Sequence, residues 1–210
     1  MQDDKSRAYR HFKKADPKLH AAALPHRKHL PSRLSEKKGK EALFDALASS
    51  IAGQQLSTKA ASTIRERLRT ACGGRITAAA IAKLSPAKLR AAGLSGAKTK
   101  SLKELAAAVQ NGILDLPALR RIPEDEASAK LTSIWGIGPW TAEMFLMFAL
   151  GRPDVFSAGD LGLVRAMEEI YGLPKNAPRE KLLELSRAWS PHRTFASLIL
   201  WRTRDNKPSV

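Results

Sequence analysis

The sequence predicts an all-α protein, and three observations support this prediction. Apolar residues recur at helical spacing, as in Leu43, Leu47 and Ile51. Residue types that start and stop helices, chiefly Ser, Thr, Asp, Pro and Gly, punctuate the chain at short intervals. There is no alternating run of β-branched residues bounded by hairpin turns, so we expect no strands. These signals together predict about ten short helices.

The signals also place the individual elements along the chain. Residues 9–24 are expected to form one helix, and the basic, proline-containing stretch 26–39 a linker. The apolar series from Leu43 to Ile51 ends at Gly53, and Ser57 is positioned to cap the next helix. Further starts and stops lie at Thr77, Ser85–Pro86, Gly93, Gly112, Pro123, Pro139, Asp160, Pro178 and Pro191.

Basic residues greatly outnumber acidic ones. The chain has 36 Lys and Arg against 20 Asp and Glu, giving a net charge of +16 and a pI near 10.3. Such a charge attracts polyanions, because each phosphate that is neutralised releases counterions. It also serves simply to keep a protein in solution. Charge therefore favours a nucleic acid partner without identifying it.

The cysteine count and the apolar runs indicate the compartment. Cys72 is the single cysteine, which excludes an intramolecular disulfide and an all-cysteine metal site, and we expect it in the core. Residues 1–14 lack the apolar stretch of a signal peptide. The longest apolar run, 144–150, is too short to span a membrane. We expect an intracellular protein, cytoplasmic and nucleoid-associated if bacterial, with no membrane contact.

The most informative segment is LTSIWGIGPWTA, residues 131–142. A helix that starts near Glu124 is expected to end before Gly136, and a second helix to start at Pro139. The two glycines, Gly136 and Gly138, allow left-handed dihedrals and close backbone approach. Amides of the turn and of the following helix would then converge on an anion such as one DNA phosphate. A tight helix–helix turn in which the glycines serve geometry alone is the simpler alternative.

This segment resembles the helix–hairpin–helix of the HhH-GPD superfamily of DNA repair glycosylases. The family's Gly/Pro-rich loop and following Asp match residues 151–160, its helix break with glutamines matches 48–57, and its second phosphate-facing turn matches 93–98. The resemblance covers nearly all of the chain and is strongest to the 3-methyladenine DNA glycosylase II group. It implies an all-α fold of two helical lobes with the active site in the cleft between them.

The resemblance also divides the chain. Residues 1–40 would be a basic N-terminal segment whose helix packs on the C-terminal lobe. Residues 41–150 would be a helical barrel lobe that includes the helix–hairpin–helix at 124–150. Residues 151–210 would supply the Gly/Pro-Asp loop and the C-terminal helices.

Asp160 is the predicted catalytic residue. Asp is a favoured N-cap, and most such residues do only that. A capping carboxylate is held ionised by the helix dipole, and an ionised carboxylate can stabilise the positive charge that develops on deoxyribose as a base leaves. The resemblance places the family's essential Asp here, and we interpret Asp154 as a loop residue. Relatives that also cleave the strand carry a Lys where this chain has Trp140, so no AP lyase activity is expected.

The resemblance suggests further site residues. Trp140, Met144 and Trp201 match positions that line the base pocket, and Met147 shares the Trp140 face. Indoles suit a cationic alkylated purine, although relatives often carry a Tyr at the Met144 position. Trp135 and Trp189 are expected in the core. Gly136, Gly138, Thr141, Ser95 and Lys98 would contact DNA phosphates, and Gln54, Gln55 or Leu56 would fill the gap left by the everted base.

No cofactor is expected to be required. The lone cysteine excludes the iron–sulfur cluster of some relatives. Relatives often hold a monovalent cation, and backbone carbonyls of Thr132, Ile134 and Ile137 would bind Na⁺ or K⁺ here. The expected protein is a monomeric, monofunctional glycosylase that releases alkylated purines from double-stranded DNA during base excision repair. A glycosylase for uracil, ethenoadenine or hypoxanthine, and a non-catalytic damage-binding module, are the alternatives.

Overall fold

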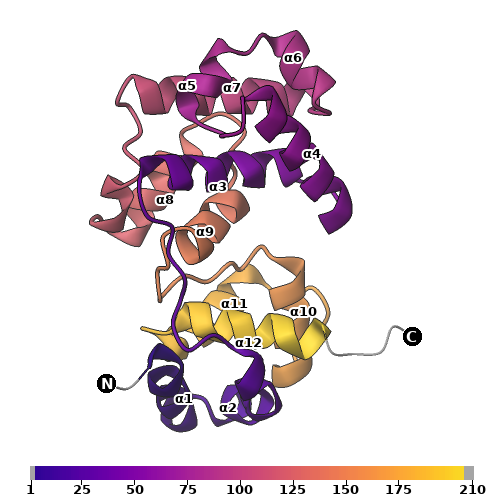
Figure 1. Ribbon diagram of the computed structural model, residues 1–210. Coiled ribbons are helices and arrows are strands. Elements are labelled where there is room, and N and C mark those ends of the chain that lie inside the picture. Colours follow the sequence, from indigo (N-terminus) through magenta and orange to yellow (C-terminus); the bar gives the residue numbers. More distant parts are fainter. Residues whose placement is uncertain (1–2, 206–210) are drawn as a thin grey trace. The chain divides into compact units, whose positions relative to one another are not determined.

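The computed structural model describes residues 3–205. Throughout that range the regular structure is helical, with no β-strand, which confirms the predicted all-α class (Figure 1). The chain forms two compact units, one of residues 36–150 and one that combines the described residues before 36 with those after 150. The sequence-based division after residue 150 falls on a unit boundary, whereas the division after residue 40 lies beyond the observed one at Ser35.

The unit of residues 36–150 is built from consecutive helices joined by short turns. Its helices are α3 (Lys40–Gly53), α4 (Thr58–Ala71), α5 (Ala78–Lys83), α6 (Pro86–Ala91), α7 (Gly96–Gln110), the 3₁₀ helix η2 (Ala118–Arg120), α8 (Glu124–Thr132) and α9 (Pro139–Phe148). The expected caps are confirmed: the Ser57, Thr77 and Ser85 side chains each accept an N–H three residues on, at the starts of α4, α5 and α6.

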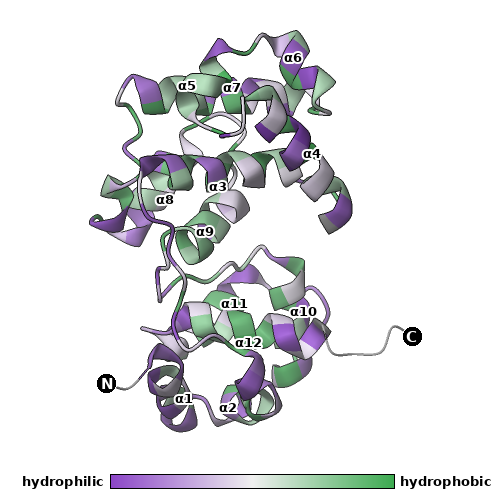
Figure 2. Cartoon of the chain, viewed as in Figure 1, coloured by the Kyte–Doolittle hydropathy of each residue, from purple (hydrophilic) through white to green (hydrophobic). Residues whose placement is uncertain are grey.

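Helix α7 lies at the centre of this unit's packing and contacts α3, α5 and α6. Its inward side chains include Leu102 and Leu105, which are fully buried with Leu47 and Ile51 of α3. Figure 2 shows apolar residues along these helices and polar ones at their ends and on α4. Burial of this apolar surface is the main stabilising contribution to the fold of the unit.

The second unit joins the two ends of the described chain. It contains α1 (Asp4–Ala15), α2 (Pro17–Ala23), the 3₁₀ helix η1 (Leu24–His29), α10 (Leu161–Tyr171), α11 (Arg179–Ser186), the 3₁₀ helix η3 (Arg187–Trp189) and α12 (Arg193–Asp205). Helix α2 packs against α10 and α12, so the N-terminal helices do pack on the C-terminal ones. Trp189, Phe12 and Phe195 are fully buried in its core, which confirms the prediction for Trp189.

The prediction of one helix over residues 9–24 was wrong in one respect, because the helix breaks at Asp16. Pro17 lacks an amide proton and disfavours a helical residue before it, so α1 ends and α2 starts with Pro17 at its first turn. The Asp16 carboxylate caps α2 through the Leu19 N–H at 3.0 Å. It also accepts hydrogen bonds from the Trp189 indole at 2.8 Å and from the Tyr171 hydroxyl.

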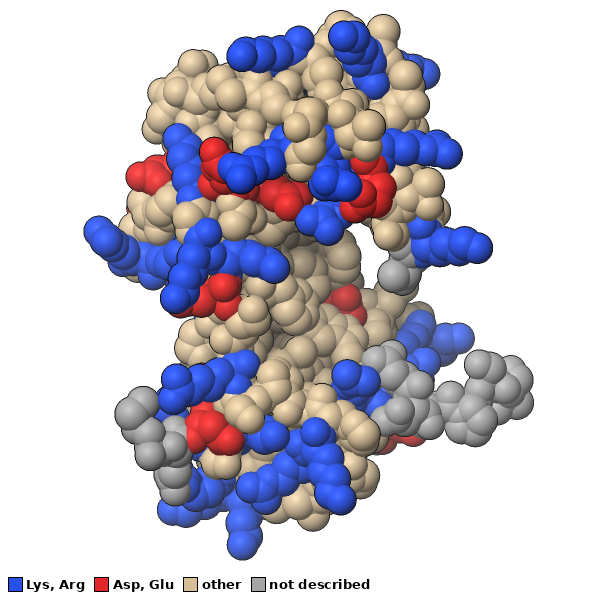
Figure 3. Space-filling model, viewed as in Figure 1, with Lys and Arg blue, Asp and Glu red and all other residues tan. Residues whose placement is uncertain are grey.

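The structure also bears on the expectations for Cys72, for membrane-spanning helices and for the surface charge. Cys72 is partly exposed and is not a core residue, because it is the C-cap of α4 and lies one turn beyond the buried Leu68. Within the described residues, no helix is long and apolar enough to cross a membrane. Lys and Arg side chains lie across the face of each unit that Figure 3 draws, as the net charge requires.

Candidate nucleic-acid interface and catalytic carboxylate

The predicted hairpin between α8 and α9 is present. Helix α8 ends at Thr132, the Ile137 N–H donates to the Ile134 carbonyl at 3.1 Å, and Gly138 is the N-cap of α9. Only Gly136 adopts a left-handed conformation, with φ of 85°; Gly138 has φ of −86°, which any residue can adopt. The first amides of α9 have no carbonyl of their own helix to bond, so they are suited to an anion.

Thr141 lies in the first turn of α9, but its side chain is turned inward. It is buried, and its hydroxyl accepts a hydrogen bond from the Gln54 side-chain amide at 3.0 Å. The same amide group donates to the Gly136 carbonyl at 3.3 Å. Thr141 can therefore offer an anion its backbone amide, but its hydroxyl is already engaged.

Gln54 opens the turn between α3 and α4, which we call the α3–α4 turn (residues 53–57). The Leu56 N–H donates to the Gly53 carbonyl at 3.2 Å, with Gln54 at φ −49° and ψ 134° and Gln55 at φ 57°. These values are typical of a type II turn, whose third residue is usually Gly. Gln55 and Leu56 are exposed, Leu56 to 38%. Of the three predicted wedge residues, these two are exposed, whereas Gln54 is partly buried.

Ser95 and Lys98 start helix α7. The Ser95 hydroxyl caps the helix by accepting the Lys98 N–H at 3.2 Å. The Lys98 ammonium donates to the carbonyls of Ala52 at 2.9 Å and Gln54 at 2.7 Å, at the end of α3. Burial lowers the pKa of Lys98 from its ordinary value. Lys98 therefore braces the α3–α4 turn in this structure, where the sequence suggested a phosphate contact.

Asp160 is the N-cap of α10, as predicted. Its Oδ1 atom accepts the Leu163 N–H at 3.0 Å and the Trp201 indole N–H at 2.9 Å. Gly162 permits this arrangement, because a Cβ there would lie 3.1 Å from Asp160 Oδ1 and 3.1 Å from Trp201 Cδ1. Trp201, predicted to line the base pocket, is thus hydrogen-bonded to the predicted catalytic carboxylate.

Asp154 is the other acidic residue of the loop at residues 151–160, and its hydrogen-bond partners lie in the same unit. Its carboxylate accepts hydrogen bonds from the Arg193 guanidinium at 2.9 and 3.3 Å, the Arg193 N–H at 3.2 Å and the Ser190 hydroxyl at 2.7 Å. Burial alone would raise the pKa of Asp154, but the bonds from Arg193 and Ser190 outweigh it and hold the pKa below 3.8. The arrangement gives Asp154 a structural role that ties the loop to the start of α12.

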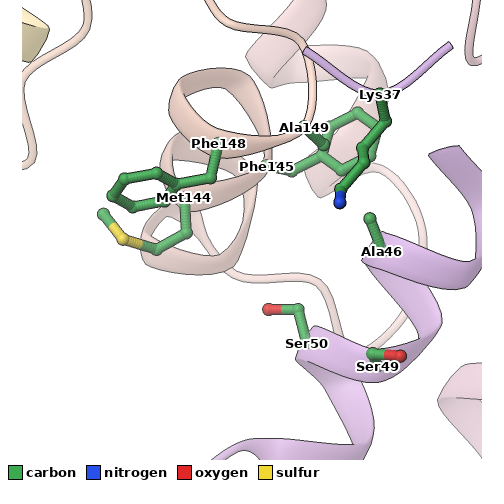
Figure 4. A pocket seen from close by; sticks show the side chains of 8 residues that line it. All are labelled: Lys37, Ala46, Ser49, Ser50, Met144, Phe145, Phe148 and Ala149. Atoms are coloured by element: carbon green, nitrogen blue, oxygen red, sulfur yellow. The ribbon is translucent and has the colours of Figure 1, made fainter. Parts of the chain in front are cut away.

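Met144 lines a pocket of about 360 Å³ between α3 and α9, together with Phe148, Ser50 and Lys37 among others. In Figure 4, Met144 and Phe148 lie on one side of α9, while the Lys37 ammonium and the Ser50 hydroxyl point into the space between the helices. Met147 is buried and does not line this pocket. Trp140 is 44% exposed at the start of α9. The grouping of Trp140 and Met144 with Trp201 joins residues of both units and stays a prediction.

The model of the HhH-GPD superfamily of base excision DNA repair proteins matches residues 48–191, more than half of the chain. The chain belongs to this superfamily. The matched region begins in α3, contains the hairpin and Asp160, and ends just before α12. The match therefore covers both the hairpin and the acid that the sequence analysis singled out.

Comparison with individual proteins agrees with this membership. The chain is 35% identical over 176 residues to DNA-3-methyladenine glycosylase 1 of Schizosaccharomyces pombe, covering 82% of this chain and 76% of that relative. It is 32% identical to putative DNA-3-methyladenine glycosylase YfjP of Bacillus subtilis, covering 77% of this chain but only 58% of that protein. The solved structure of S. pombe 3-methyladenine DNA glycosylase in complex with abasic DNA superposes with a TM-score of 0.82 at 30% identity, covering 97% and 99% of the two chains.

Trp135 of this HhH-GPD protein was expected in the core and is not there. It is 46% exposed, and the Lys100 ammonium lies 4.4 Å from the centre of its ring. Helix α8 ends at Thr132, so helical periodicity gives no information about a residue in the hairpin.

Sequence reasoning also missed Arg193, whose partner Asp154 lies 39 residues away. No local signal indicates such a pair.

Proposed function

We propose that this protein is a monofunctional DNA glycosylase that hydrolyses the N-glycosidic bond of alkylated purines, of the 3-methyladenine type, everted from duplex DNA. The observation that carries the proposal is the anchoring of Asp160 at the start of α10 by the Leu163 amide and the Trp201 indole. Two relatives are named 3-methyladenine glycosylases, and a similar enzyme has been solved with abasic DNA, the product of base removal.

The proposed chemistry is dissociative. As the bond between sugar and base lengthens, positive charge develops on the deoxyribose, and a fixed carboxylate stabilises that charge. The amide and the indole fix one oxygen of Asp160, so little reorganisation is needed as the charge forms. Water oriented by Asp160 then adds to the sugar and leaves an abasic site. A purine nucleotide methylated at N3 carries a cationic base that leaves readily, so one carboxylate suffices without a catalytic His.

The absence of lyase activity is part of the proposal. Trp140 stands at the start of α9, where strand-cleaving relatives carry a Lys, and an indole cannot form a Schiff base with the sugar. Trp140, Met144 and Trp201 would instead surround the everted base. Each indole contributes ~0.5–2 kcal/mol of cation–π attraction to a cationic base.

The unit of residues 36–150 is proposed to make the contacts with the DNA backbone and minor groove. The amides of Gly136, Gly138 and the first turn of α9 are proposed to bind one phosphate, and the start of α7 at Ser95 a second. Gln55 or Leu56 is proposed to enter the minor groove. We further propose that the protein acts as a monomer, needs no iron–sulfur cluster, and works inside the cell.

A monovalent cation at the hairpin also remains a proposal. Thr132 is the last residue of α8, where carbonyl groups lack intrahelical partners, and Ile134 and Ile137 follow it in the hairpin. The Ile134 carbonyl already accepts the Ile137 N–H, and its second lone pair remains suited to a hard cation. The donor set is thus compatible with Na⁺ or K⁺, which would hold the hairpin in shape.

The decisive experiment detects free bases by chromatography after incubation with methylated DNA. The wild type should release 3-methyladenine and leave abasic DNA, Asp160→Asn should bind the duplex but release nearly nothing, and Asp154→Asn should retain release. Borohydride should trap no protein–DNA adduct. Duplexes with uracil, ethenoadenine or hypoxanthine define the lesion range. Tight binding to lesion DNA without release of any base would overturn the proposal in favour of a damage-binding module.

A further inference from the structure

Three segments that the proposed function places on DNA are linked by side-chain hydrogen bonds. Lys98, in the first turn of α7, bonds the Ala52 and Gln54 carbonyls at the end of α3. The Gln54 side chain in turn bonds Thr141 and Gly136 in the hairpin region. The result is a continuous path from α7 through the α3–α4 turn to the hairpin, all within the unit of residues 36–150.

The α3–α4 turn needs such support because its backbone is strained. Gln55 has φ of 57°, a conformation that non-glycine residues adopt only a few per cent of the time. Strained residues of this kind persist where the surrounding structure holds them. Two of the bonds that hold this turn come from the Lys98 ammonium, one to the residue immediately before Gln55. The Gln54 side chain adds two more, to the Thr141 hydroxyl and the Gly136 carbonyl.

The position of the Lys98 ammonium indicates which helix dipole its charge stabilises. A cation in the first turn of a helix is unfavourable with respect to that helix's dipole, whereas a cation at a helix C-terminus is favourable. The Lys98 ammonium lies at the C-terminal carbonyls of α3 and is partly buried. Two of the three ammonium N–H donors are engaged by these carbonyls, so a movement of the side chain toward a phosphate would weaken the bonds that hold the turn. The same holds for Gln54, which would have to leave Thr141 to enter a DNA groove.

We propose that Lys98 and Gln54 are positioning residues: they fix the α3–α4 turn to the hairpin, so that Gln55 and Leu56 meet the duplex already in place for insertion. Neither residue binds phosphate or enters the groove. The inference rests on the proposed function, because it assumes that the hairpin and the turn face DNA. Preorganising the turn lowers the entropy lost on insertion, so it promotes base eversion more than it promotes overall binding.

The test separates a positioning role from a phosphate contact by salt dependence. Lys98→Met keeps the length of the side chain and removes its donors. Its matched control is Lys103→Met, which removes one positive charge from the same helix together with a bond to the Ala82 carbonyl in α5. Affinity for an abasic-site duplex is measured across salt concentrations, and eversion by the fluorescence of 2-aminopurine beside the lesion. A lost phosphate contact lowers the slope of log K against log salt by about 0.9.

Lys98→Met should leave that slope unchanged and reduce both eversion and the single-turnover rate by about 10- to 100-fold, with little change in KM. Lys103→Met should leave eversion unchanged. A slope lower by about 0.9 in Lys98→Met, or normal eversion, overturns the inference. Gln54→Ala, whose side chain is partly exposed, should reproduce the loss of eversion, and it decides the matter if Lys98→Met does not fold. Normal eversion in Gln54→Ala also overturns the inference.

Failure of the proposed function is distinguishable from failure of this inference. Eversion and salt dependence are measured on binding alone, so they are informative even if the wild type releases no base. A double-mutant cycle adds a readout that needs no DNA. Gln55→Gly removes the strain at φ 57°, so Lys98→Met should destabilise the Gln55→Gly protein less than the wild type. Strict additivity of the two substitutions would show that Lys98 does not support the strained turn.

Discussion

The backbone at Gly136 passes so close to Ser101 that a Cβ at position 136 would lie 1.8 Å from the Ser101 hydroxyl oxygen and 2.7 Å from its Cβ. Ser101 is buried on α7, and its hydroxyl donates to the Ala97 carbonyl at 3.1 Å. The hairpin therefore rests directly on α7 at a distance that no other residue type at 136 permits. The left-handed φ of 85° at Gly136 is a second reason why a residue with a side chain is unfavourable there.

Gly136→Ala should lower the free energy of unfolding by about 2–4 kcal/mol, from overpacking against Ser101 together with an unfavourable backbone conformation. Urea denaturation of the two proteins measures the difference. Ser101→Gly in the same chain should restore part of the loss by removing the nearest atoms, although the strain at φ 85° remains. A Gly136→Ala protein as stable as the wild type would contradict this close packing of the hairpin on α7.

Gly138→Ala provides the matched comparison in the same loop. Gly138 has φ of −86°, and a Cβ there would meet no atom within 4 Å, so stability should be nearly unchanged. A phosphate bound at the first turn of α9 would, however, approach this position closely. We therefore expect weaker binding to duplex DNA with an unaltered unfolding curve. Unchanged affinity would mean that the DNA backbone does not approach the hairpin at Gly138.

Gln55→Gly should separate the backbone of the α3–α4 turn from its side chain. Gly adopts φ of 57° without strain, so the free energy of unfolding should stay within about 1 kcal/mol of the wild type or rise. If Gln55 is the residue that enters the groove, eversion of a lesion should fall despite this stability. Leu56→Ala is the control, and 2-aminopurine fluorescence shows which of the two substitutions suppresses eversion.

The helices were predictable because their signals are local. Ser57 and Asp160 cap helices with their own side chains, and Gly138 lies directly before α9. A cap needs only the residues that follow it within one turn, so sequence order contains the information. The break at Asp16 was missed because apolar spacing across residues 9–24 outweighed the effect of Pro17, although that signal is equally local.

The roles of individual site residues were less predictable because their partners are distant in sequence. Lys98 was expected on a phosphate, yet its carbonyl partners lie 46 and 44 residues before it. Gln54 was one of three candidates for the residue that enters the groove, yet its side-chain partner Thr141 is 87 residues away. Charge and residue type indicate which kinds of partner a side chain can bind. The tertiary packing determines which of these partners it contacts.

Asp154→Asn should change the pH dependence of stability. The pKa of this carboxyl is held below 3.8 in the folded protein, so its contribution is fully present above that value and is lost as pH falls through the folded pKa. At neutral pH the substitution should lower the free energy of unfolding by about 1–2 kcal/mol, because charged hydrogen bonds are lost from a partly exposed group. Denaturation between pH 7 and pH 3 should show the two proteins converging at low pH. A constant difference would exclude titration of Asp154 as the cause.

Trp201→Phe should distinguish orientation of Asp160 from stacking on a base. Phenylalanine keeps an aromatic face but cannot donate the hydrogen bond that the indole makes to Asp160 Oδ1 at 2.9 Å. A hydrogen bond to a charged group contributes about 1.5–3 kcal/mol, so its loss should slow base release by about 10- to 100-fold if the carboxylate leaves its position. Affinity for lesion DNA should change little, and Trp140→Phe should slow base release much less than Trp201→Phe does.

Trp201→His retains a ring N–H and should recover part of the rate of base release. Equal, small effects of Trp201→Phe and Trp140→Phe would show that both indoles act only by stacking, and the Leu163 amide would then be enough to orient Asp160.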